Sequence, residues 1–298
     1  MASTRSVNSW DLLIRKEGDN IFLDKRPQSR IDFVSVNENA GVSWGADVGA
    51  AQDLPKESVN HPDNLATEAT AINHNFAQQL LSAPAGVEKP PPHVFDAPNP
   101  FLSSLNKGSE PASVAFRYRR WRLPGGVQLV ARCSLNGFVE RKDGEAAYVI
   151  SKALNEGDSK GQPGHVDWRQ KLEMQTGAVL AAEMKKDMYK LARWVSEAVL
   201  SGAHEMRLGF VSRVNPKQNH KHAILMVKTY SPTTFADSVN VDRRKLWGTL
   251  SQILMHVKKL EDGTFILLRD AQKQTLHFHA IPADAFDHEL DDIEDEQE

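Results

Sequence analysis

The 298-residue sequence has a single cysteine, Cys133, and few aromatic residues, 7% of the total. A single cysteine excludes an internal disulfide and a cluster of zinc-binding thiolates, and it is typical of a reducing compartment. No run of about 18 apolar residues is present, which excludes a transmembrane helix. The start shows no charged and then apolar leader, so we expect no secretory signal and a cytoplasmic protein without a membrane partner.

Several patterns that identify enzymes are also missing. The sequence has no P-loop, no dinucleotide-binding fingerprint and no internal repeat. Its histidines do not follow a recognisable metal-binding spacing, and the pair His277 and His279 has no obvious further ligand. We therefore predict no cofactor and no metal site.

Charge is distributed unevenly along the chain. Residues 284–298 contain nine acidic residues and no Lys or Arg, so the formal net charge of −3 becomes +6 when residues 1–283 are counted alone. A mildly basic body with an acidic tail is compatible with a polyanion-binding surface, and also with solubility alone. The tail has too few apolar residues to pack and is predicted to be disordered.

Apolar periodicity predicts a mixture of helices and strands. We expect helices over 65–81, 189–200 and 242–260, a short helix from Val166 with Asp167 as its N-cap, and another beginning at Ser231-Pro232. Strands are expected over 10–14, 21–24, 31–36, 113–123, 127–134, 146–154, 207–211, 222–230, 265–268 and 275–281. Residues 37–63 and 82–109 are predicted to be a long surface loop and an extended connector.

The stretch 177–214 is predicted to form a strand, a helix and a second strand, with Gly202 as a left-handed helix cap. The first strand, 178–182, would end at Glu183-Met184-Lys185, which places Glu183 and Lys185 on one side. Such a pair could hold a ligand or a metal, or it could be a structural salt bridge. Glu156 and Asp158 form a similar pair after the strand 146–154.

Two other groups of polar residues are candidates for binding. On the strand 113–123, Arg117 and Arg119 share a face with Trp121, and Arg120 lies on the opposite face with aromatic residues. Arginine beside aromatic rings suits RNA, although arginines can equally shield a sheet. On the helix 65–81 the candidates are Thr70, Asn73 and His74, a polar patch that is either a solvated face or a contact surface for a polar ligand.

Two resemblances follow from these motifs. The order acid-x-acid at Glu156–Asp158, Glu-apolar-Lys at 183–185 and then a helix with a basic residue before Trp resembles the decapping-exonuclease family. In that family the acids hold divalent metals for RNA 5′-end hydrolysis. A longer set of motifs covers nearly the whole chain. It resembles the family of the d component of eukaryotic translation initiation factor 3, in the mRNA cap-binding domain of that family. These motifs are TRSV (4–7), SWD (9–11), DKR (24–26), NLA (64–66), EAT (68–70), INHNF (72–76), YRRW (118–121), LNE (154–156), VDWRQKL (166–172) and YKLARW (189–194).

The second resemblance implies an α+β fold of two mixed β-sheets flanked by helices, related to the decapping nucleases. It implies that residues 1–283, as a piece of a longer chain, bind the 7-methylguanosine cap of selected mRNAs. The loop 37–63 is the candidate for a family insertion that can close the RNA groove. The implied partners are capped mRNA, the other subunits of initiation factor 3 and the small ribosomal subunit.

The implied function is binding and not catalysis, and the alternative is a metal-dependent RNA 5′-end nuclease. The predicted cap- and RNA-binding residues are Val7, Asn8, Thr70, Asn73, His74, Arg117, Arg119, Arg120, Glu156, Asp158, Glu183 and Lys185.

Overall fold

The computed structural model describes residues 9–26, 55–79, 115–140, 144–156, 167–186, 188–270, 273 and 275–286. The predicted strand 31–36, the connector 82–109, most of the loop 37–63 and nearly all of the acidic tail lie outside these residues. The chain divides into two compact units. The first comprises the described residues within 1–35, 121–129 and 242–298, and the second those within 36–120 and 130–241.

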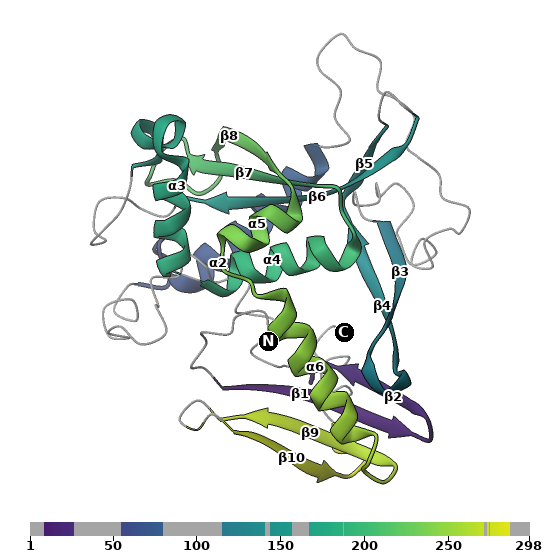
Figure 1. Cartoon of the computed structure of the whole chain (residues 1–298). Helices are drawn as coiled ribbons and strands as arrows, with labels where there is room; N and C mark the ends of the chain where they lie inside the picture. The colour runs from purple at the N-terminus through teal and green to yellow at the C-terminus, as the bar shows by residue number, and fades with distance from the viewer. Residues whose placement is uncertain are drawn as a thin grey trace, which may run out of the picture. The chain divides into compact units, whose positions relative to one another are not determined.

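The first unit is built on an antiparallel sheet with the strand order β10-β9-β1-β2 (Figure 1). Its strands are β1 (Trp10–Glu17), β2 (Asn20–Asp24), β9 (Gly263–Arg269) and β10 (Leu276–Ile281). Both of its predicted hairpins are confirmed, since β1 pairs with β2 and β9 pairs with β10. β1 also pairs with β9, so segments about 250 positions apart in the sequence share one sheet.

The predicted helix over 242–260 is confirmed as α6 (Arg243–Val257). Asp242 caps it, because its side chain accepts hydrogen bonds from the backbone N–H groups of Arg244 and Lys245. The apolar face of α6 supplies Ile253 and Val257 to a core that they share with Ile14 of β1 and Leu267 of β9. The helix thus covers one face of the sheet, and the apolar side chains buried between them stabilise the unit.

The second unit contains a mixed sheet with the order β5-β6-β7-β8. Its strands are β5 (Gly137–Glu140), β6 (Ala146–Asn155), β7 (Glu205–Arg213) and β8 (His222–Tyr230). β6 and β7 run parallel, whereas the outer pairs are antiparallel. A parallel pair needs a crossover, and this one carries α3 (Trp168–Lys186) and α4 (Met188–Ser201).

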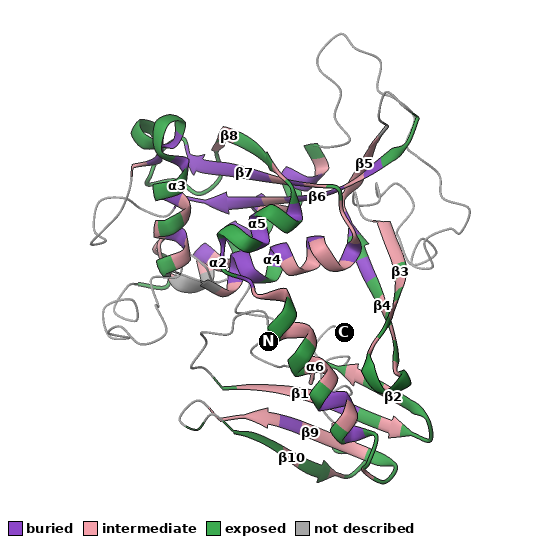
Figure 2. Ribbon diagram, in the orientation of Figure 1, coloured by how far each residue is buried: buried purple, intermediate pink, exposed green. Residues whose placement is uncertain are grey.

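β6 and β7 are buried along most of their length (Figure 2), as expected for strands covered on both faces. The predicted helix over 65–81 is confirmed as α2 (Pro62–Gln78), and its Ile72 and Phe76 pack on Ala153 of β6 and Val211 of β7. The short helix α5 (Pro232–Ser238) begins after Ser231, as predicted.

The β3–β4 hairpin is also confirmed, with β3 at Ala115–Arg122, the short 3₁₀ helix η4 at Pro124–Gly126 and β4 at Gln128–Leu135. Gly202 ends α4 with a φ of 67°, and Ala203 N–H donates to Ala198 O at 2.9 Å. This left-handed cap was predicted from the position of the glycine.

One predicted strand is wrong. Residues 178–182 belong to α3, which continues to Lys186 through a local distortion at Gln175. The buried residues Leu172, Thr176, Val179 and Glu183 recur at intervals of three and four, which is the period of a helix face. Alanine, leucine, methionine, glutamate and lysine also favour helix over strand, so local propensity and burial agree.

The predicted α+β fold class is confirmed, with one difference in detail. Among the described residues the β5–β8 sheet is mixed, but the β10-β9-β1-β2 sheet is antiparallel throughout. That residues 1–283 act as one cap-binding domain stays a prediction. In the described part of the chain, no helix is long and apolar enough to cross a membrane.

Gly209 of β7 provides a test of the packing between α2 and the sheet. A Cβ atom at this position would lie 2.5 Å from the ring of Phe76. We expect Gly209→Ala to lower the free energy of unfolding by about 1–3 kcal/mol, because the ring has to move within a packed core. Gly177→Ala is the control, since a Cβ there meets nothing within 4 Å. Urea unfolding of both variants measures the difference, and equal midpoints would contradict the close approach.

Candidate nucleic-acid interface

The carboxyl ends of the parallel strands β6 and β7 lie at the same edge of the mixed sheet. Ligands of α/β sheets commonly bind at such an edge. Asn155 ends β6 there, Glu156 follows it, and Arg213 ends β7. These residues lie at the centre of the candidate interface.

Glu156 is buried, and its carboxylate is used by the fold. Its Oε1 accepts a hydrogen bond from Trp168 N–H at 2.9 Å, at the start of α3. Its backbone N–H donates to Val211 O at 2.8 Å, which continues the pairing with β7. Glu156 therefore caps α3 beside Asp167, whose Oδ1 accepts from Gln170 N–H. Asp158, its predicted partner, lies outside the described residues.

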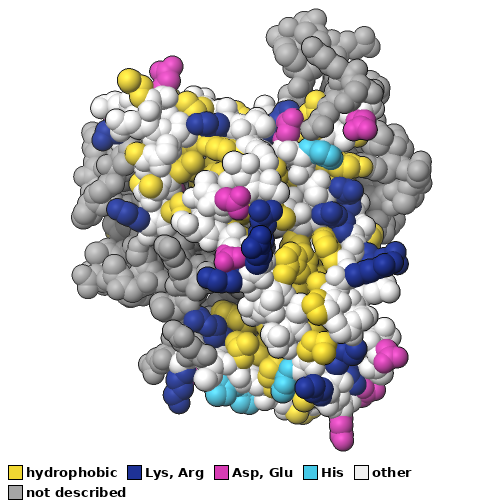
Figure 3. Space-filling model, viewed as in Figure 1, with side chains coloured by type: hydrophobic (Ala, Val, Ile, Leu, Met, Phe, Trp, Pro, Cys, Tyr) yellow, Lys and Arg dark blue, Asp and Glu magenta, His cyan; other side chains and the backbone are white. Residues whose placement is uncertain are grey.

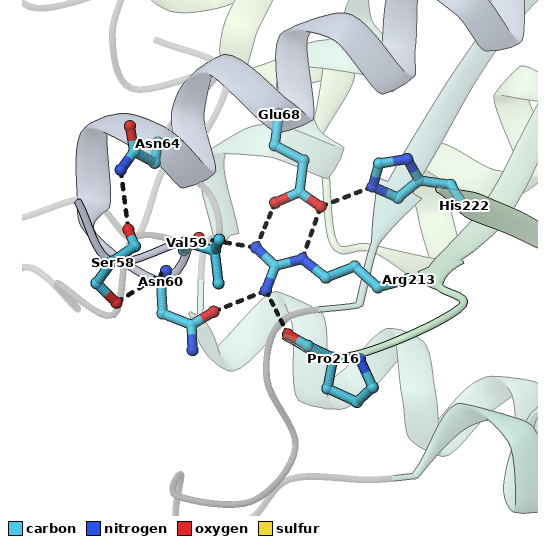
Figure 4. Close-up of polar contacts among 8 residues, drawn as sticks. All are labelled: Ser58, Val59, Asn60, Asn64, Glu68, Arg213, Pro216 and His222. Atoms are coloured by element: carbon cyan, nitrogen blue, oxygen red, sulfur yellow. Dashed lines mark hydrogen bonds and ion pairs between the residues drawn. The ribbon is translucent and has the colours of Figure 1, made fainter. Parts of the chain in front are cut away.

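Arg213 is the centre of a buried polar cluster (Figure 4). Its Nε donates to Glu68 Oε1 at 2.8 Å, and its Nη2 donates to the other carboxylate oxygen. The remaining donors reach Val59 O, Asn60 Oδ1 and Pro216 O at 2.8–3.0 Å. All five N–H groups of the guanidinium are thus used.

Glu68 comes from α2, so the ion pair fastens this helix to the end of β7. The side chains of Arg213 and Glu68 are only 5% and 1% exposed. His222, at the start of β8, places Nε2 2.7 Å from Glu68 Oε1 and donates to it, because a carboxylate only accepts. Arg169 of α3 adds a bond to Arg213 O at 3.0 Å. One carboxylate therefore joins α2, β7 and β8.

The three predicted residues of α2 have different roles. Thr70 and His74 are exposed, one helical turn apart, and Thr70 Oγ1 donates to Ala66 O. Asn73 instead pairs with the backbone of β6: its Nδ2 donates to Ala153 O at 3.0 Å and its Oδ1 accepts from Ala153 N–H at 2.9 Å. Thr70 and His74 are thus available to a ligand, whereas the amide of Asn73 is engaged by the sheet.

Arg117 and Arg119 point to the carboxyl end of α4. Arg117 Nη1 donates to Ser201 O at 2.9 Å and its guanidinium lies 4.2 Å from the ring centre of Tyr148. Arg119 Nη1 donates to Leu200 O at 2.6 Å and to Val199 O at 3.2 Å. These bonds satisfy carbonyls that a helix leaves free at its end, and the positive charges suit its dipole. Arg120, on the opposite face of β3, is exposed.

Glu183 and Lys185 do not form the predicted pair on one side of a strand. Both lie on α3, where residues two apart point in different directions. Glu183 is buried and Lys185 is exposed. The physical reason is the helical conformation of 178–186, which turns the two side chains about 200° apart.

The remaining predicted residues, Val7 and Asn8, lie outside the described part of the chain, so the structure does not place them. Within that part, no group of three or more His, Cys, Asp or Glu side chains is arranged to hold a metal ion. Of the predicted residues, the structure brings Arg117 and Arg119 together at the carboxyl end of α4. Asn73 and Glu156 bond separately to the central strands, Asn73 to Ala153 of β6 and Glu156 to Val211 of β7.

Sequence reasoning missed Glu68 and Arg213, which are separated by 145 positions. A signal for Glu68 was nevertheless present. It occupies a position on the apolar face of α2, three residues after Leu65 and four before Ile72. A charged residue at such a position is expected to have a buried partner, although the spacing does not say which one.

Comparisons with known proteins agree on one family. The family model described as "Eukaryotic translation initiation factor 3 subunit 7" matches residues 1–280. The D component of eukaryotic translation initiation factor 3 from Xenopus tropicalis is 43% identical over 286 residues, 96% of this chain and 49% of that protein. The D-2 component of the same factor from Drosophila virilis is 43% identical over 295 residues, 99% of this chain and 50% of that protein. The chain thus spans about half the length of these curated relatives.

The fold is also similar to solved structures of Rai1. Scheffersomyces stipitis Rai1 in complex with (3'-NADP)+ and calcium ion has a TM-score of 0.53 at 10% identity, over 92% of this chain and 62% of that one. Candida albicans Rai1 in complex with pU5-Mn2+ has a TM-score of 0.52 at 11% identity, over 94% of this chain and 66% of that one. At this identity the likeness shows a shared fold.

The buried cluster leads to a prediction about stability. We expect Glu68→Gln to lower the free energy of unfolding by about 3–5 kcal/mol, because it leaves Arg213 buried without a charged partner. Glu197→Gln, at partly exposed ion pairs with Arg193 and Lys152, should cost at most about 1 kcal/mol. Urea unfolding measures both. A Glu68→Gln protein as stable as the Glu197→Gln control would mean that the cluster does not stabilise the unit.

Proposed function

Because the chain belongs to the eukaryotic translation initiation factor 3 subunit 7 family, we propose that it binds the 5′ 7-methylguanosine cap and adjacent RNA of selected mRNAs. It does so in the cytoplasm, as part of an initiation factor 3 complex on the small ribosomal subunit. The interpretation as a binding module, without catalysis, follows the names of its relatives, which are components of an initiation factor.

The observation that supports this proposal is that Glu156 and Glu68, at the sheet edge, are already bonded to other parts of the protein. Glu156 already accepts a backbone hydrogen bond from α3, and Glu68 is neutralised by Arg213. A two-metal nuclease needs carboxylates whose oxygens face the ions. Using these two for catalysis would uncap a helix and leave a buried guanidinium unpaired, so binding is the function that this arrangement favours.

The RNA groove is proposed to follow the exposed face of α2. Thr70 and His74 offer hydrogen-bonding groups one turn apart, and the opposite face of the same helix is fixed on the sheet by Ile72 and Phe76. A rigid helix that presents polar side chains is well suited to a ligand contact. Asn73 supports this surface from within, through its bonds to β6, whereas Arg117 and Arg119 hold β3 to α4.

Cross-linking to RNA with a labelled cap, with free cap analogue as competitor, tests the proposal. We expect cross-linking that the analogue abolishes. Thr70→Glu places an anion beside the RNA and should weaken binding on the order of three- to tenfold. Thr70→Gln, similar in size but neutral, is the control. Unchanged binding of Thr70→Glu would remove this face of α2 from the groove. Asn73→Glu is a poorer test, because it also breaks two bonds to β6.

A separate assay addresses catalysis. The full chain is incubated with 5′-monophosphate RNA and with capped RNA, in magnesium and in manganese. We expect release of neither nucleotides nor cap. Release that is lost in Glu156→Gln and Glu183→Gln proteins that remain folded by circular dichroism would replace the binding proposal with a 5′-end nuclease.

A further inference from the structure

The β3–β4 hairpin has two faces with different surroundings. The inner face carries Arg117 and Arg119, which bond to the end of α4, and the buried Cys133. The opposite face, or outer face, consists of Phe116, Tyr118 and Arg120 of β3 with Val130 and Arg132 of β4. Tyr118 is 73% exposed and Val130 is 61% exposed, and both arginines are exposed. An apolar patch with charged side chains around it often marks an interaction site.

Charge on the outer face has one sign. Residues 115–135 include five arginines and no Asp or Glu. Figure 3 shows Lys and Arg side chains, in dark blue, over the hairpin on the right of the view. In the described part of the chain Arg120 and Arg132 form no ion pair, whereas the inner arginines are satisfied by helix carbonyls. The outer face therefore complements an anionic partner.

Aromatic rings accompany these charges. The guanidinium of Arg132 lies 4.9 Å from the ring centre of Phe116, which holds the charge against the hairpin. Tyr118 follows Phe116 on the same side of β3, since residues two apart share a face. Its ring shares the outer face with Arg120 and Arg132, and it is exposed and therefore open to a planar ligand.

We propose that the outer face binds single-stranded RNA, with the ring of Tyr118 stacked on a base and Arg120 and Arg132 bound to phosphates. Aromatic stacking combined with arginine contacts is a common way to hold a single strand without reading its sequence. A duplex keeps its bases stacked inside and offers none to Tyr118. The inference extends the proposed function, on which it rests, because it adds a contact that requires no cap.

The test measures binding of the full chain to an uncapped oligouridine by fluorescence anisotropy at several salt concentrations. Tyr118→Ala should weaken binding roughly 5- to 150-fold, because base stacking on one ring is worth about 1–3 kcal/mol. Tyr118→Phe keeps the ring and should bind like the unaltered protein. Arg120→Ala should reduce the slope of log affinity against log salt by about 0.7, the value for one phosphate contact in a single strand.

Two control variants separate binding from folding. Arg119→Ala, next in sequence but on the inner face, should lower the melting temperature, whereas Arg120→Ala should not. Arg244→Ala removes an exposed arginine of α6 and should leave affinity unchanged. Wild-type affinity of both Tyr118→Ala and Arg120→Ala would overturn the inference, and capped-RNA cross-linking that persists in those variants would leave the proposed function standing.

Two further binding measurements distinguish single-stranded RNA from other anionic partners. Duplex RNA bound as tightly as oligouridine would contradict stacking on Tyr118. An oligoglutamate peptide of equal charge that competes equally with RNA would assign the face to an acidic protein and overturn the inference. Conversely, oligouridine binding that depends on Tyr118, in a protein that shows no cap-dependent cross-linking, would support the outer face and reject cap recognition.

Discussion

The ion pair between Glu68 and Arg213 is the contact on which the arrangement of the mixed sheet's edge depends. It joins α2 to the end of β7, and its remaining donors hold the turn at 58–60 and the loop at Pro216. A buried ion pair of this kind gains little over a hydrophobic contact of the same volume, because both charges lose their water. Its value here is geometric. The bidentate geometry fixes the direction from which α2 approaches the strands, and with it the positions of Thr70 and His74.

Asparagine side chains complete the same sheet where a strand is absent. On the edge of β6 that faces away from β7, β5 pairs only with residues 146–149, so among the described residues no strand lies beside the later backbone groups of that edge. Asn136 Oδ1 accepts from Ser151 N–H at 2.9 Å, and the amide of Asn73 bonds both backbone groups of Ala153. A carboxamide resembles a peptide group, so it can take the place of a neighbouring strand. α2 is therefore attached to β6 both by its apolar face and through this hydrogen-bonded pair. Of the polar patch predicted on this helix, Asn73 thus has a structural role, whereas Thr70 and His74 are exposed.

Much of the fold follows from periodicity, and the contacts between distant segments do not. The apolar residues of α2 and α6, the hairpins and the cap at Gly202 were predicted because each depends on neighbours within one or two turns. Residues 178–182 were misassigned because a short apolar run fits a strand as well as a buried helix. The roles of Arg117 and Arg119 could not be predicted, because nothing local indicates that the carbonyls of residues 199–201 lie opposite them. For the candidate site, the sequence indicated α2, β3 and the end of β6, and their part in binding stays a prediction. The sequence did not indicate which side chain on each element is occupied by the protein itself.

The hairpin shows how one run of residues serves two purposes. The segment from Phe116 to Arg122 alternates along a strand, so its arginines are divided between two faces. Inner arginines meet the end of α4, where Gly202 allows close approach, since a Cβ there would lie 2.8 Å from Arg119 Nη1. Outer arginines meet no such acceptor among the described residues. Because the inner contacts anchor the strand to a helix, the outer side chains project from a backbone that is already fixed, and a ligand bound there costs less conformational entropy. The structural arginines therefore make the exposed ones better able to bind a ligand.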